Sequence, residues 1–193
     1  MEDEEFSPSL EVEELLERYA AGERDFREVD LSSCDLTGVN LCGINLSESD
    51  FTYTNFTGAN LSRANFSKCM MITAILEGAD LSYANLSGSD WTECDFSGAN
   101  LVGANFSGSE MFTAILRGAN LSGANLSNVG LNVANLVGAN LTDADLSGAS
   151  LESADITDAN LTGVKNANIS GAIIYITTTM PDGSVVEHRQ ICE

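Results

Sequence analysis

Prolines, histidines and basic residues are scarce in this sequence. Its 193 residues include two prolines, one histidine and eight Lys and Arg, against 29 Asp and Glu, and the formal net charge is −21. This charge repels nucleic acid and anionic lipid, so we expect no direct binding to either, and we expect a protein partner to present basic surface. The lone histidine, His188, has no cysteines or carboxylates spaced around it for a metal site or a catalytic triad.

Long apolar runs are also missing. No run approaches the roughly 20 residues of a membrane-spanning helix. The first thirty residues carry twelve carboxylates and three arginines, which is the opposite of the basic and then apolar start of a signal peptide. These features predict a cytoplasmic protein with no membrane segment, and we expect its acidic residues 1 to 6 to be disordered.

Cysteine pairs and phosphate-binding glycine loops are absent as well. The five cysteines fit neither a disulfide framework nor a C-x2-C zinc spacing, and no G-x-G-x-x-G segment opens a helix. Cys34, Cys69 and Cys94 stand where a small apolar residue is otherwise usual, so we interpret them as reduced, packed thiols. The sequence therefore predicts no cofactor, no metal and no catalytic residues, and we expect that the protein is not an enzyme.

A period of five residues organises most of the chain. Every fifth residue from Phe26 to Leu161, 28 positions in all, is large and apolar: 18 are Leu, six Phe, two Met, one Trp and one Ile. The residue two places earlier is Ala at 16 of these positions, and the residue immediately before is Asn or Asp at 22. Neither an α-helix nor a β-strand keeps residues at this spacing on one face.

A chain that turns a corner every five residues does keep them on one face. Each pentad then sends one large and one small side chain inward. Asn, Asp and Gly suit the corners, because Asn and Asp bond locally to the backbone and Gly permits positive φ. Stacked coils of this kind pair their backbones at the strand spacing of about 4.8 Å.

The pentads, written A-N-L-S-G, A-N-F-S-G and A-D-L-S-G, strongly resemble those of the pentapeptide-repeat family, in particular its cyanobacterial members, over residues 24–163. The resemblance implies an all-β solenoid: a right-handed quadrilateral parallel β-helix with one pentad per side and 20 residues per coil, hence about seven coils or more. It also implies a non-enzymatic role, since characterised members act mainly by binding, in topoisomerase protection and developmental regulation.

A longer repeat in the sequence supports four sides. The segment from Phe56 to Leu86 aligns with the segment from Phe96 to Leu126 at a lag of 40 residues. Forty is two coils of 20 residues but no whole number of coils of 15 or 25, so solenoids with three or five sides fit poorly.

The N-terminal end departs from the repeat and is expected to cap the solenoid, which otherwise exposes its core and unpaired strand edges. Ser7-Pro8 resembles a helix N-cap followed by a first-turn proline, and Gly22 stands where a C-terminal glycine is expected. The apolar stripe of this helix, predicted to lie across the first coil, consists of Val12, Leu15, Leu16 and Tyr19.

The C-terminal end also leaves the repeat. Lys165 and Asn166 break the register, the run from Ile173 to Thr179 has strand character, and residues 180–183 (M-P-D-G) are a turn signal. We expect a C-terminal cap here, with the last few residues loose. The sequence thus predicts three parts: an acidic tail and capping helix (1–23), the repeat β-helix (24–163), and a C-terminal cap and tail (164–193).

One side of the predicted coil departs from the consensus, and we name it the divergent side. It is centred on Leu31, Phe51, Met71, Trp91, Met111, Leu131 and Leu151. None of its five middle pentads ends in glycine, although glycine ends six of the seven pentads on the next side. Its outward positions mix apolar and acidic residues, with Ile75 and Ile115 extending them around the adjoining corner. The candidate interaction surface is Asp50, Tyr53, Met70, Ile72, Asp90, Glu93, Glu110, Phe112 and Val133.

Exposed apolar patches tend to mark contacts. Either a partner docks on the divergent side, and this includes a second copy in a weak homodimer, or the chain's own terminal segments cover it, or its corner geometry tolerates bulk. The leading hypothesis is a non-enzymatic interaction or scaffold module. The alternative, which the family resemblance suggests, is an acidic DNA mimic that binds a type II topoisomerase such as gyrase. An acidic ridge of Asp30, Asp50, Asp90 and Glu110 favours that alternative, but Met70 interrupts the ridge.

Overall fold

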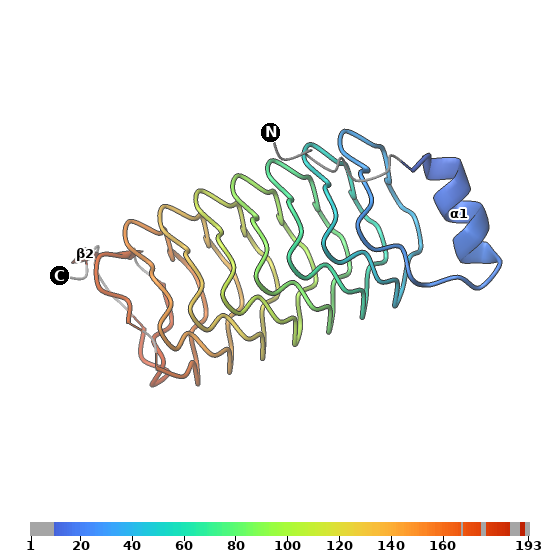
Figure 1. Cartoon of the computed structure of the whole chain (residues 1–193). Helices are drawn as coiled ribbons and strands as arrows, with labels where there is room; N and C mark the ends of the chain where they lie inside the picture. Colours follow the sequence, from blue (N-terminus) through green and yellow to red (C-terminus); the bar gives the residue numbers. More distant parts are fainter. Residues whose placement is uncertain (1–9, 167, 175–176, 186–189, 192–193) are drawn as a thin grey trace, which may run out of the picture.

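The computed structural model describes residues 10–166, 168–174, 177–185 and 190–191, and it is a single file of stacked coils with a helix at the N-terminal end (Figure 1). The elements are α1 (Val12–Ala20), β1 (Ile173–Ile174) and β2 (Gln190–Ile191). Between α1 and β1 the backbone pairs through isolated parallel bridges that join each coil to the next.

The bridges establish the four-sided coil. From Asp25 to Lys165 every parallel bridge joins residues 20 apart, and a new bridge occurs every five residues, so each coil has four sides. The large residue of a pentad donates its N–H to the following coil, as Leu61 does to the carbonyl of Asp80 (2.7 Å), and the bridging residue donates back, as Asp80 does to Ala59 (2.9 Å). The coil of 20 residues predicted from the pentads is therefore confirmed.

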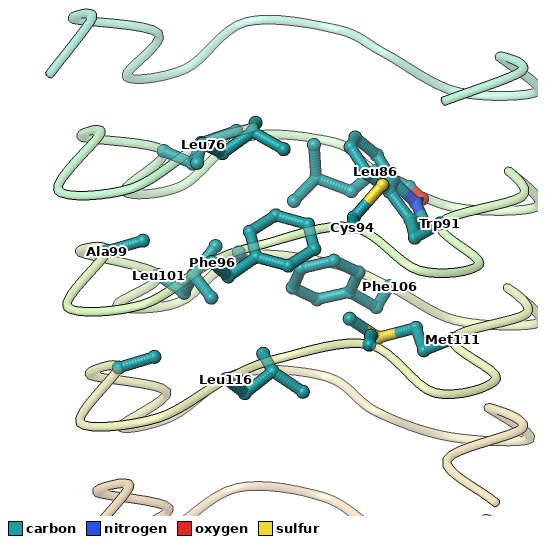
Figure 2. Packing of buried hydrophobic residues seen from close by; sticks show 14 of the residues in the cluster. Leu76, Leu86, Trp91, Cys94, Phe96, Ala99, Leu101, Phe106, Met111 and Leu116 are labelled. Atoms are coloured by element: carbon teal, nitrogen blue, oxygen red, sulfur yellow. Dashed lines mark hydrogen bonds between the residues drawn. The ribbon is translucent and has the colours of Figure 1, made fainter. Parts of the chain in front are cut away.

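The core is a continuous column of side chains. All 28 of the large residues from Phe26 to Leu161 are at most 2% exposed. Phe51, Phe56 and Phe66 pack with ring centroids 5.4–5.8 Å apart, and Trp91, Phe96 and Phe106 repeat this cluster 40 residues later at 5.3–6.0 Å. Figure 2 shows the second cluster inside the coils. The aromatic clusters thus recur every second coil, which distributes side-chain volume evenly along the core.

Each corner is a tight turn with one left-handed residue. In the turn of residues 56–59, Ala59 donates its N–H to the carbonyl of Phe56 (2.9 Å), and Gly58 has a φ of +63°. Type II turns require such a φ at their third residue. Every residue two places after a large core residue has a φ between +55° and +73°, whether or not it is glycine.

Asn side chains reinforce the corners in two ways. The Oδ1 atom of Asn60 accepts the N–H of Ser62 (3.1 Å), which is the local bond expected from the sequence. In addition, the Asn85 Nδ2 donates to Asn65 Oδ1 of the preceding coil (2.9 Å), and similar bonds continue to Asn105 and Asn125. This ladder between coils satisfies side chains that a single pentad leaves unpaired.

At the N-terminal end, α1 covers the first coil. Leu15 is fully buried, and Val12, Leu16 and Tyr19 pack against the same core, as their spacing predicts. The helix ends in a Schellman motif: Gly22, at a φ of +99°, donates its N–H to the carbonyl of Tyr19, and Glu23 donates to that of Arg18. The predicted C-terminal glycine is confirmed.

The predicted start of this helix was wrong. α1 begins at Val12 with Glu11 as its N-cap, and Leu10 is not helical; Ser7 and Pro8, like the expected disordered residues 1 to 6, lie outside the described residues. Leu10 packs and hydrogen-bonds to the coils instead of joining the helix. Its side chain is buried at the open end of the coils, and its N–H donates to the carbonyl of Asp30 (3.3 Å).

At the C-terminal end the register shifts. Asp155 bridges to Ile173 and Asn160 to Thr179, so the spacing falls from 20 residues to 18 and 19. Gly183 donates its N–H to the carbonyl of Met180 (2.9 Å), which confirms the turn predicted there. The expectation that the last residues are loose was wrong for Gln190–Ile191, since β2 pairs antiparallel with β1.

Candidate interaction surface

The divergent side forms one continuous flank of the solenoid. Its bridging residues stack in the order Asp30, Asp50, Met70, Asp90, Glu110, Gly130 and Ser150. The structure thus brings together the nine residues predicted from the sequence, in adjacent coils spaced by about 4.8 Å.

Apolar side chains on this side are open to solvent. Tyr53 is 63% exposed, and Met70, Phe112 and Val133 are each 49–50% exposed. Ile75 and Ile115 follow at the adjoining corner, with exposures of 40% and 37%. No described segment of the chain covers these side chains, so the described parts of the two ends do not explain them as internal packing.

Some residues of the candidate surface are less exposed than the sequence suggests. Ile72, Asp50 and Asp90 are partly buried, whereas Glu93 and Glu110 are exposed. Ile72 is the residue directly after the core residue Met71. Asp50 and Asp90 each accept a backbone N–H two residues on, from Thr52 (2.8 Å) and Thr92 (3.0 Å), which draws their carboxylates toward the corner.

The three middle coils of this side differ in the side chains that they present to solvent. The coil of Met71 presents Ile72 and Ile75, and the coil of Met111, 40 residues later, presents Phe112 and Ile115. The coil between them presents Asp90, Glu93 and Asp95. Ile72 and Ile75 are thus matched two coils later by Phe112 and Ile115, with a carboxylate-bearing coil between them, whereas the two flanking coils present Tyr53 and Val133.

The corners of this side carry strained residues. Thr73, Thr113 and Val133 have φ values of +59°, +56° and +60°, and among the 28 corners they are the only β-branched ones. A β-branched residue in the left-handed region is an outlier, because its Cβ substituents crowd the backbone. Backbone strain of this kind tends to collect at functional sites.

Replacing Val133 with glycine is expected to stabilise the protein by about 1 kcal/mol, since glycine adopts the same φ without a Cβ. The increase appears as a higher midpoint of urea denaturation followed by circular dichroism. The reciprocal control is Gly138→Val on the next side, where φ is +69° and the substitution should destabilise by a similar amount. A Val133→Gly variant that is less stable than the parent chain contradicts the assignment of strain.

At the corners that lead into the divergent side, buried serine hydroxyls take part in the hydrogen bonding between coils. Ser89 and Ser109 donate to the carbonyls of Phe66 (2.7 Å) and Leu86 (2.8 Å) of the preceding coil. Ser89 also accepts the N–H of Cys69 (2.9 Å), so a bond between coils replaces the usual turn bond at that corner. Both hydroxyls therefore take part in the hydrogen bonding between coils.

Three of the cysteines, Cys34, Cys69 and Cys94, pack in or against the core. Cys69 and Cys94 are buried, and burial raises the pKa of the Cys69 thiol to about 12 and also raises the pKa of Cys94. A thiol with a raised pKa is a poor nucleophile, since only the thiolate reacts readily. Cys34 is partly buried, with a pKa raised by burial, and Cys192 lies outside the described residues.

Neither a metal cluster nor a membrane-spanning helix occurs in the described part of the chain. No three His, Cys, Asp or Glu side chains converge there as metal ligands. Its helical segment is too short to cross a bilayer. His188 lies outside the described residues. The divergent side presents apolar and acidic groups side by side.

One exposed aromatic residue lies on another side. Tyr83 is 61% exposed and packs beneath the guanidinium of Arg63, 5.7 Å from the ring centroid. A Cβ on Gly103 in the next coil would meet this ring at 2.8 Å, so the glycine makes room for it. The corresponding signal in the sequence is a tyrosine at a corner position with a glycine 20 residues later.

The repeats match the family model described as pentapeptide repeats, in eight copies over residues 30–67, 74–111, 114–132 and 134–174. These segments cover more than half of the chain, which therefore belongs to the pentapeptide-repeat family. Members of this family form right-handed quadrilateral β-helices and are generally non-catalytic. The family and the quadrilateral β-helix predicted from the pentads are confirmed, while the count of seven or more coils stays a prediction.

Several solved structures are similar to this chain. A pentapeptide repeat protein from the thylakoid lumen of Arabidopsis thaliana is 33% identical, over 51% of this chain and 68% of its own, with a TM-score of 0.50. HetL of Nostoc sp. Strain PCC 7120, involved in heterocyst differentiation regulation, is 30% identical over 92% of this chain and 100% of its own, with a TM-score of 0.30. Rfr23 of the cyanobacterium Cyanothece 51142 is 29% identical over 86% and 96%, with a TM-score of 0.46. No curated protein matches the chain.

Proposed function

We propose that this protein is a non-enzymatic interaction or scaffold module that binds a partner protein through its divergent side. The observation that carries the proposal is the concentration of exposed apolar side chains on one flank, led by Tyr53, Met70 and Phe112. Burying such side chains in an interface gains about 25 cal/mol per Å² of apolar surface, whereas leaving them exposed favours aggregation.

The backbone of this side supports the proposal. Outward positions of a repeat are free to vary, and variation without a role should spread over all four sides. Here the β-branched corners gather on one side, at Thr73, Thr113 and Val133, together with the apolar bulk. A strained corner that also presents a large side chain is costly to stability, and a contact with a partner offsets that cost.

The alternative of DNA mimicry has weaker support. A mimic of duplex DNA needs a long, largely polar, acidic surface. Met70 separates Asp50 from Asp90 in the bridging column, and Gly130 and Ser150 continue it without charge. Phe112 projects beside the only exposed carboxylate of the column, Glu110. The surface is thus divided into apolar and acidic parts.

The three parts of the chain and its place in the cell also belong to this proposal. We propose an acidic tail and capping helix in residues 1–23, the repeat β-helix in residues 24–163, and a C-terminal cap and tail in residues 164–193, because a solenoid needs both of its open ends covered. The cytoplasmic location stays a prediction, and one relative comes from a thylakoid lumen.

The double variant Ile72→Ser and Phe112→Ser is expected to weaken partner binding by at least about tenfold, because apolar anchors are typically worth 1–3 kcal/mol each. The measurement is quantitative capture of bound proteins by the parent chain and the variant. Val102→Ser is the matched control, since Val102 occupies the position equivalent to Ile72 on the opposite side and is also partly buried. A partner that both variants retain equally well refutes the proposal.

A further inference from the structure

The two apolar rows on the divergent side have a fixed separation. Ile72 and Phe112 occupy the same position of coils that are two apart, as do Ile75 and Ile115. At the strand spacing, two coils amount to about 9.6 Å along the solenoid axis. A partner that covers both rows must present two apolar groups at this distance.

Carboxylates fill the interval between the rows. The intervening coil presents Asp90, Glu93 and Asp95, and Glu110 stands beside the second row. The five middle pentads of the divergent side contain no Lys or Arg. A partner must therefore bring positive charge to the space between its two apolar groups, or leave these carboxylates without a counter-ion.

An α-helix meets both requirements and a β-strand does not. Residues seven apart on a helix share a face and are separated by about 10.5 Å, with the residues three and four places along lying between them on that face. Residues on one face of a strand are separated by about 6.6 or 13.2 Å, and neither distance matches the rows.

We propose, as a refinement that rests on the proposed function, that the divergent side binds a basic amphipathic helix lying along the solenoid axis. Apolar residues of this helix at positions i and i+7 contact the row of Ile72 and Ile75 and the row of Phe112 and Ile115. Lys or Arg at i+3 and i+4 meets Asp90, Glu93 and Asp95. Met70 lies beside the first row and adapts to the shape of the apolar residue that it receives.

A second copy of this chain is a poorer occupant. Its rows have the right spacing, but its own divergent side brings only carboxylates to the carboxylates already present. With a net charge of −21 per chain, the two copies also repel each other as whole molecules. Charge complementarity thus favours a basic helix over a second copy of the chain as the occupant of the divergent side.

The test uses a fluorescent alanine-glutamine helix with two leucines seven residues apart and arginines three and four residues after the first leucine. Its control has the same composition, with the leucines moved to opposite faces of the helix. We expect the patterned helix to bind the full chain at least about tenfold more tightly than its control in fluorescence anisotropy. We expect Ile72→Ser with Phe112→Ser to remove that difference, and Val102→Ser to leave it unchanged.

Each result separates this proposal from the proposed function. Equal binding of the two peptides shows that charge alone attracts them. This result overturns the proposal that a patterned amphipathic helix binds the divergent side. A chain that is dimeric in sedimentation, and that the Ile72→Ser and Phe112→Ser variant makes monomeric, makes the second copy the occupant and also overturns it. Either result leaves the divergent side as an interface if partner capture still depends on Ile72 and Phe112; loss of that dependence defeats the proposed function itself.

Discussion

Replacing Trp91 with alanine is expected to destabilise the β-helix by about 3–5 kcal/mol, as truncation of a buried aromatic residue generally does. Trp91 is fully buried and contacts Phe96 and Phe106 of its own cluster, at 5.3 and 6.0 Å between ring centroids. It also contacts Phe66, at 6.4 Å, and so joins this cluster to the one formed by Phe51, Phe56 and Phe66. The cavity would thus lie at the junction between successive coils, where a solenoid depends on its neighbours.

The measurement is urea denaturation followed by circular dichroism at the β-sheet band. Trp91→Leu is the matched control, because leucine fills most of the equivalent positions and should cost less than half as much. The Trp91 Nε1 bond to the carbonyl of Leu86 is lost in both variants, but Ser109 still donates to that carbonyl. A Trp91→Ala variant within 1 kcal/mol of the parent chain would contradict this account of the core.

Removal of residues 1–22 is expected to cause end-to-end association or aggregation. α1 buries Leu15 completely against the first coil, and the Tyr19 hydroxyl donates to the carbonyl of Cys42 (2.9 Å). Without α1, the side chain of Phe26 and the free strand edge of the first coil become accessible, and such an edge is a template for pairing with another chain. Light scattering coupled to size-exclusion chromatography measures the effect.

A milder variant separates capping from loss of the whole segment. Leu15→Lys places a charge in the interface of α1 with the first coil, whereas Glu13→Lys places the same charge on the exposed face of α1. We expect association and a lower melting temperature for Leu15→Lys, and behaviour near that of the parent chain for Glu13→Lys. A monomeric truncated protein with unchanged melting argues against a capping role.

The core could be predicted in full because its positions are tied to a strict period. Each inward residue must fill the same space in every coil, so the spacing of Phe26 to Leu161 identified all of them as buried. The bounds of the ends were harder to predict, since no period applies there. The pattern at Ser7-Pro8 placed the helix start too early, and the pairing of Gln190 with Ile174 depends on a contact between distant segments that no local signal specifies.

The sequence could predict which residues lie on the candidate surface, but not how far each side chain is exposed to solvent. Departures from the consensus located Tyr53, Phe112 and Val133 on one side, and the bridges place them there. The partial burial of Ile72, and the turn bond that draws in Asp90, depend on how each side chain lies over its neighbours in the stack. Such contacts arise between coils, and a single pentad contains no information on them.

The most direct test of the interaction surface is site-specific photocrosslinking in the full chain. A benzophenone side chain at position 112, on the divergent side, is compared with one at position 102, on the opposite side, and the products are identified by mass spectrometry. We expect position 112 to yield a crosslink to one partner protein, through a basic segment of that protein, and position 102 to yield none. Equal crosslinking from both positions, or the same partner from position 102 alone, would contradict this expectation.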